Sequence, residues 1–228
     1  MVLAVVLLRL RTLTDVEEPR ITNTTTAVDA ADTTVDRRKL AWVLGCAFAF
    51  GFCYVQLEYA LPVFAGSVQN SSLVGVLFTI NAITVVLLQV PLNQFTSRIN
   101  SSALVICGAL LLMATSFASA SLGSVAGLIG CVVLLSVAEV LIDPRIDSEI
   151  AATVPRHRRG VAFGFIGTAI AAGGACANGL AAVLASDNGA PERQFWLLLV
   201  AVSAGFAVIL YVASLAIQPR RVVSSKTS

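Results

Sequence analysis

Two acidic residues, Glu139 and Asp143, lie within or just below a strongly apolar segment, in the stretch SVAEVLIDPRIDSEI. They are four residues apart, so on a helix they would share one face. A carboxylate inside a membrane costs several kcal/mol unless it is paired, protonated or hydrated, and such residues often mark ion pathways. Glu139 lies deeper, and two roles are open for it: a proton carrier, or a hydrogen-bond acceptor for a neighbouring helix. We expect Asp143 to reach water or to pair with Arg145 or a nearby loop arginine.

Further polar residues interrupt other apolar segments. Glu58 lies in the stretch CYVQLEYALP, beside Tyr54 and Gln56, and Asn81 and Gln89 share the next segment. Glu58 either faces an internal cavity or lies close enough to the membrane surface to be hydrated. Glu58 and Glu139 are therefore both candidates for proton coupling.

The composition indicates that these residues lie in a bilayer. The 228 residues are 57% hydrophobic and only 12% charged, with a mean hydropathy of +0.87, whereas soluble domains have about 25% charged residues. A membrane-spanning helix needs about 20 apolar residues. Six segments meet this requirement: residues 40–66, 72–94, 102–120, 123–143, 160–185 and 195–217. The sequence therefore predicts an all-α integral membrane protein with six transmembrane helices.

Enzymatic chemistry has little support in this sequence. The five cysteines all lie in apolar runs without metal-type spacing, and His157 is the only histidine. There is no glycine-rich phosphate loop and no pairing of a nucleophile with a base. The basic stretch PRHRRG is explained by membrane topology and anionic lipid rather than by nucleic acid. We expect a protein that is not an enzyme, with no cofactor, no metal and no nucleic-acid partner.

The basic residues define an orientation. If residues 11–39 form a cytoplasmic linker, Arg193 is the only one of the 15 Lys and Arg residues that faces the outside. The positive-inside rule thus favours a multi-pass protein of the cell membrane with a cytoplasmic linker and C-terminus. The predicted organisation is the end of a truncated helix (1–10), the linker (11–39), the six-helix bundle (40–217) and a cytoplasmic tail (218–228).

The fifth predicted span is rich in glycine. Gly160 and Gly164 form a small-xxx-small pattern, which allows two helices to approach closely. Gly173 and Gly174 are adjacent and fall near the middle of the membrane. These four glycines indicate either tight helix packing or a flexible point in a helix that must rock.

The stretch AEVLIDPRIDSEIAATVPRHRRGVAFGFIGTAIAAGG resembles the tenth-to-eleventh helix region of the major facilitator superfamily. The matching positions are Ala138-Glu139, Pro144, Val154-Pro155 and Arg159-Gly160. YVQLEYALPVF is similar to the seventh helix of that family, and LLQVPLNQFTSRINSS to the eighth helix and its basic loop. In that loop only Arg98 keeps the family pattern, so Arg98 and Arg159 are the candidate loop-motif residues.

The resemblance implies the C-terminal six-helix half of a twelve-helix major facilitator fold, in which residues 1–10 end the sixth helix and the N-terminal half is absent. Tyr54, Gln56, Asn81 and Gln89 would then line the cavity. The first hypothesis is secondary active transport of a small molecule, as proton-coupled export by a drug/proton antiporter-type carrier. Its partners would be the lipid bilayer, a small-molecule substrate and a separate N-terminal half. The alternative is a truncated, non-transporting membrane protein or a partner-binding half.

Overall fold

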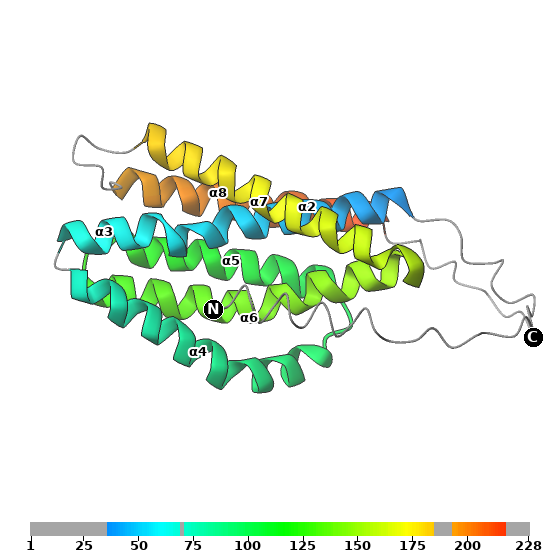
Figure 1. The fold of residues 1–228 in the computed structure, drawn as a ribbon, viewed down its shortest axis with the longest axis horizontal. Coiled ribbons are helices and arrows are strands. Elements are labelled where there is room, and N and C mark those ends of the chain that lie inside the picture. The colour runs from blue at the N-terminus through cyan, green and yellow to red at the C-terminus, as the bar shows by residue number, and fades with distance from the viewer. Residues whose placement is uncertain (1–35, 69–70, 185–192, 218–228) are drawn as a thin grey trace, which may run out of the picture. The chain divides into compact units, whose positions relative to one another are not determined.

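The computed structural model describes residues 36–68, 71–184 and 193–217, all within one compact unit, Thr34–Ser228. The predictions for residues 1–10, for most of the linker and for the tail fall outside these residues. The elements, drawn in Figure 1, are α2 (Arg37–Glu58), α3 (Ala60–Val68), α4 (Ser71–Ser97), α5 (Ser102–Ala120), α6 (Val125–Thr153), the short 3₁₀ helix η2 (Arg156–Arg158), α7 (Arg159–Val183) and α8 (Arg193–Ile217).

The prediction of six spans is confirmed. Among the described residues, six helical segments are long and apolar enough to cross a membrane, with α2 and α3 forming the first of them. The fourth span differs from its predicted bounds, because α6 continues through Pro144 to Thr153. A proline removes one backbone hydrogen bond without always ending a helix, and in membrane helices neighbouring groups can satisfy the freed carbonyl.

Short polar residues set where several helices begin. Asp36 precedes α2, and its carboxylate accepts hydrogen bonds from the backbone N–H groups of Arg38 and Lys39. Ser101 and Ser124 cap α5 and α6 in the same way. These caps satisfy backbone donors that the first helical turn leaves without partners.

The first span is interrupted at Tyr59, between α2 and α3. Pro62 lies four residues after Glu58, so it has no N–H to donate to the Glu58 carbonyl, and its ring crowds that carbonyl. Glu58 therefore ends α2 at a discontinuity in the backbone, and its side chain is exposed.

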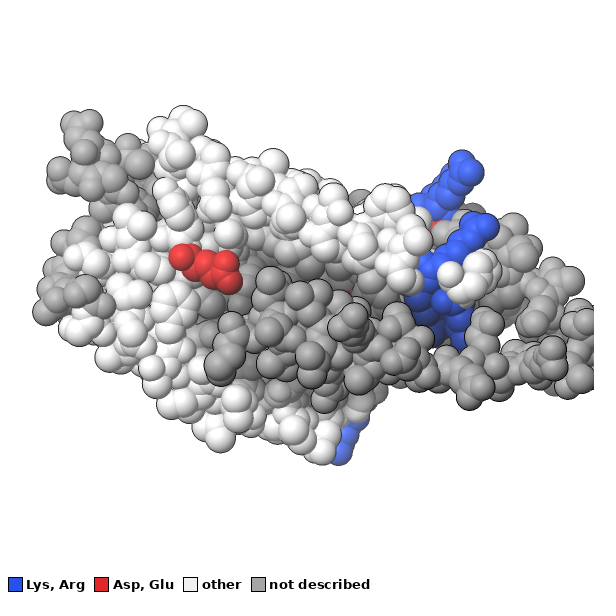
Figure 2. Space-filling model, viewed as in Figure 1, with Lys and Arg blue, Asp and Glu red and all other residues white. Residues whose placement is uncertain are grey.

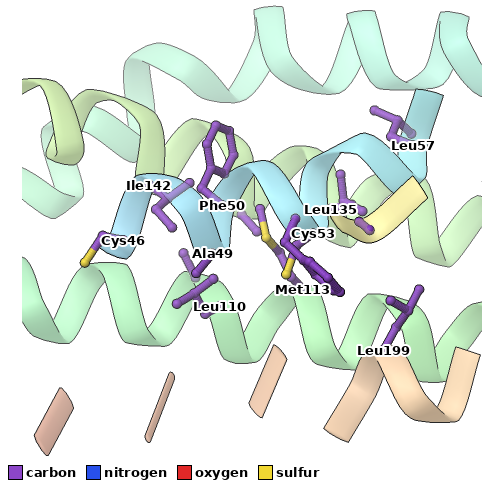
Figure 3. Packing of buried hydrophobic residues seen from close by; sticks show 14 of the residues in the cluster. Cys46, Ala49, Phe50, Cys53, Leu57, Leu110, Met113, Leu135, Ile142 and Leu199 are labelled. Carbon is purple, nitrogen blue, oxygen red and sulfur yellow. The ribbon is translucent and has the colours of Figure 1, made fainter. Parts of the chain in front are cut away.

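Helix α2 lies at the centre of the packing. It contacts α5, α6, α7 and α8, while α5 packs along α6 and α8, and α4 packs mainly along α6. Figure 3 shows the side chains of Ala49 and Cys53 of α2 over Leu110 and Met113 of α5, within the buried apolar cluster. The indole N–H of Trp42 also donates to the Leu210 carbonyl of α8, at 2.9 Å.

The contact between α2 and α7 depends on two glycines. A Cβ atom at Gly51 would collide with the backbone of Ile170, and a Cβ atom at Gly173 would collide with the backbone of Phe48. The two helices therefore approach closely because both positions lack a side chain. Gly174 is less constrained, because a Cβ atom added there would lie 3.5 Å from the Val55 side chain, an ordinary contact distance.

The other two predicted packing glycines have open surroundings. An added Cβ atom at Gly160 or Gly164 would meet nothing within 4 Å. Within the described residues, the close approach of α7 to α2 is thus made at Gly173 and not at the small-xxx-small pattern nearer the start of the helix.

Basic side chains gather at one end of the described bundle. In Figure 2 the visible Lys and Arg lie mainly where α2 begins and where α6 meets α7. Lys39 of α2 forms a 3.0 Å ion pair with Glu149 of α6 at this end. Arg193, at the start of α8, belongs to the opposite end of the helices.

Replacing Gly173 with alanine is expected to destabilise the protein by about 1–3 kcal/mol, because the new methyl group would meet the backbone of α2. Gly167→Ala, in the same helix, is the matched control, since its Cβ atom would meet nothing within 4 Å. Thermal unfolding in detergent measures the difference. Equal midpoints for the two variants would contradict a close contact between α2 and α7.

Candidate functional site

Three helices bring polar side chains together around Glu139. The Tyr54 side chain of α2 and the Asn81 side chain of α4 both interact with the Glu139 carboxyl group of α6. The Asn81 amide Nδ2 also donates to the Ser136 hydroxyl at 2.8 Å. We call Tyr54, Asn81, Ser136 and Glu139 the polar cluster. It joins residues separated by more than 80 positions in the sequence.

The carboxyl group of Glu139 is only partly satisfied. Its side chain is half-buried, and its Oε2 atom is buried without a hydrogen-bond partner among the described residues. Among the described residues Glu139 forms no ion pair, since the pair that is formed, Lys39–Glu149, lies at the basic end of the bundle. An unsatisfied acidic oxygen is costly in a low-dielectric interior. The Oε2 atom of Glu139 is therefore able to bind a proton or to accept a hydrogen bond from another donor.

Ser136 is a member of the cluster that the sequence analysis missed. It lies three residues before Glu139, so the two share a face of α6. Its hydroxyl is fully buried and donates to the Val132 carbonyl at 2.7 Å, which leaves the oxygen free to accept from Asn81. The spacing from Glu139 was the signal that could have identified it.

The other predicted polar residues lie in different surroundings. Glu58 and Gln89 are both exposed on the described bundle. Gln56 is 1% exposed, and both polar atoms of its amide lack a partner among the described residues. Because buried polar atoms are normally hydrogen-bonded, water or a small ligand could supply the missing partners of the Gln56 amide.

Asp143 and Arg145 do not form the ion pair that the sequence suggested as one possibility. Asp143 is exposed, whereas the Arg145 guanidinium donates to the backbone carbonyls of Thr96 and Ile99. The carbonyls at the end of a helix lack intrahelical partners and attract a cation. Arg145 thus ties α6 to the end of α4 through two backbone carbonyls, one of which, that of Thr96, also accepts the Ile99 N–H.

The two loop-motif arginines differ in their contacts. Arg98 is exposed just beyond the end of α4. Arg159 starts α7, and its guanidinium donates to the Ala151 carbonyl of α6 at 2.7 Å, while its Nε atom is buried without a partner in the described structure. Arg159 therefore fixes the junction between α6 and α7.

The described residues hold no group of three or more His, Cys, Asp or Glu side chains that could bind a metal ion. What the arrangement offers is one acidic group, one phenol, one amide and one hydroxyl, placed among membrane-spanning helices. Such a set can bind a polar solute or hold and release a proton.

The fold and the cluster define a multi-pass membrane protein with an acidic group within its helices. The family model of the Major Facilitator Superfamily matches residues 65–228, well over half of the chain, so the protein belongs to that superfamily. Its members transport small molecules across membranes and are not enzymes. A comparison with curated proteins finds no match, and neither does one with solved structures.

Replacing Asn81 with leucine is expected to lower the stability by about 1 kcal/mol, because a hydrogen bond between membrane helices is lost. Thr79→Val is the matched control, since the Thr79 hydroxyl is bonded to a carbonyl of its own helix, that of Gly75. The midpoint of thermal unfolding gives the comparison.

A double-mutant cycle of Asn81→Leu with Ser136→Ala separates this contact from other effects of each change. A coupling energy of zero would show that α4 is not held to α6 through these two side chains.

Proposed function

We propose that this chain is the C-terminal six-helix half of a secondary active carrier that exports a small molecule in exchange for protons. The single observation that supports this most is the polar cluster, in which side chains of α2 and α4 interact with a half-buried glutamate of α6 whose Oε2 atom has no partner among the described residues. Carriers of this kind bind their substrates near the middle of the membrane, between two halves that rock against each other.

Glu139 is the proposed proton-coupling residue. The Tyr54 and Asn81 side chains interact with its carboxyl group, and its buried Oε2 atom, which has no partner among the described residues, is where a proton would bind. Glu58 is the second candidate, with an exposed side chain next to the break between α2 and α3. Gln89, which is exposed, is proposed to contribute to the cavity wall once a second half is present, whereas Gln56 is buried within this half.

The surfaces of α4 and α7 support a partner half. In α4 only 6% of the most apolar stretch is buried, and in the span that contains α7 the share is 28%, against 61% in the first span and in α5. Glu139 lies between α2 and α4, beside this exposed region. An N-terminal half placed against α4 and α7 would close the cavity over the cluster. A non-transporting or partner-binding half is the alternative.

The distribution of charge supports a cytoplasmic location for the basic end of the bundle. A green fluorescent protein fused after Ser228 is therefore expected to fluoresce in cells, and alkaline phosphatase fused at the same place is expected to be inactive. When the reporters are placed after Asp187, between α7 and α8, the fluorescent protein should be dark and the phosphatase should be active. Active phosphatase at the C-terminus would overturn the orientation.

Glu139→Gln is expected to abolish proton-driven transport while substrate binding persists, because glutamine keeps the shape of the side chain and cannot release a proton. The carrier would be tested with its N-terminal half, reconstituted in liposomes that contain a trapped pH indicator. Transport of lipophilic cations, weak acids and neutral sugars would be followed after a pH jump.

Asp143→Asn is the matched control, since it also keeps the shape of the side chain, and Asp143 is an exposed acid one turn away on the same helix. Proton coupling that survives in Glu139→Gln would reject the role of Glu139. Coupling lost in Glu58→Gln alone would move the role to the second candidate. If no substrate of the panel moves with the halves combined, the alternative of a non-transporting protein is favoured.

A further inference from the structure

An apolar groove opens at the basic end of the bundle, between α2 and α7. It has a volume of about 450 Å³, within the range of pockets that hold small organic ligands. Its walls are mostly apolar, and two arginines lie among them. The lining residues are Arg37, Leu40, Val154, Arg158, Val161, Ala162 and Phe165.

The groove extends from the charged rim towards the apolar part of the bundle. Arg158 and Phe165 are seven residues apart, which corresponds to about 10 Å along a helix. The arginines therefore lie at the level where the headgroups of the bilayer begin, and the apolar lining lies at the level of the upper acyl chains. A ligand that fills this groove needs an anionic end and an apolar end.

The charges of the two arginines are not neutralised within the described structure. Arg37 and Arg158 are exposed, and neither forms an ion pair with another described residue. Two acids at this end of the bundle have other partners: Asp36 caps the start of α2, and Glu149 is paired with Lys39. The arginines are thus free to bind an anion from outside the bundle.

We propose that this groove binds an anionic phospholipid. The phosphate would lie between Arg37 and Arg158, and an acyl chain would run along Leu40, Val161 and Phe165. Basic pockets between membrane helices are suited to anionic headgroups, and arginine forms paired hydrogen bonds with phosphate. Because the groove contacts both α2 and α7, a bound lipid would bridge the two helices whose close approach depends on Gly51 and Gly173.

Native mass spectrometry of the full chain tests this proposal, with palmitoyl-oleoyl phosphatidylglycerol and phosphatidylcholine added in equal amounts. The wild type is expected to retain one phosphatidylglycerol in preference to phosphatidylcholine. Arg37→Gln with Arg158→Gln should reduce that preference about thirtyfold, because each arginine contributes about 1 kcal/mol at a membrane surface.

The matched control is Arg38→Gln with Arg156→Gln. These two arginines are exposed neighbours on the same elements, and the pair removes the same charge, but neither residue lines the groove. Retention of phosphatidylglycerol by the control supports the site. An equal loss in both double variants would show a general effect of surface charge and would overturn it.

A second pair of variants tests the apolar part without changing charge. Val161, which is 66% exposed and lines the groove, would be replaced with tryptophan to fill it, and Val183, 81% exposed at the other end of α7, gives the control Val183→Trp. Loss of bound lipid in Val161→Trp alone supports the proposal. Unchanged lipid binding in Val161→Trp would overturn the proposal. A wild type that shows no preference for phosphatidylglycerol would also overturn it, since another part of the carrier would then fill the groove.

Discussion

Hydrocarbon offers no hydrogen-bond partners, so the polar groups of the six spans have to be satisfied within the protein. This constraint explains the all-helical architecture of the described residues. It also explains why hydroxyl groups such as those of Thr79 and Thr168 bond to carbonyls one turn earlier in their own helices. Glu139 is one of the exceptions, because one of its oxygens is buried without a partner among the described residues, as are both polar atoms of the Gln56 amide.

The same constraint gives α2 its central position. Its two glycine contacts with α7 bring backbone against backbone, which in a membrane is a main source of attraction between helices. Its Trp42 indole reaches a carbonyl of α8, and its Tyr54 reaches the carboxyl group of α6. One helix therefore connects the tightly packed part of the bundle to the polar cluster, and a shift of α2 would alter both.

The polar residues fall into two zones with different physics. At the basic end, Arg145 and Arg159 bond to backbone carbonyls and fix the ends of α4 and α6, while Arg37 and Arg158 remain available to an anion. Deeper in the bundle, the polar cluster depends on weak, uncharged donors around one acid. The first zone ties the ends of the helices together, and the second is the one to which we assign proton transfer in the proposed function.

The sequence alone determined the class of protein and the six spans, and it singled out Glu139 as an acid within a span, because length, apolar composition and the position of a charge are local properties of the chain. It also placed the basic residues at one end. Only the tertiary structure decided which partners each residue has. Ser136 joined the cluster, Arg145 turned to the carbonyls of α4 instead of Asp143, and Gly173 rather than Gly160 came against another helix. These outcomes depend on how the helices are rotated and how closely they approach, which is set by packing between segments far apart in the sequence.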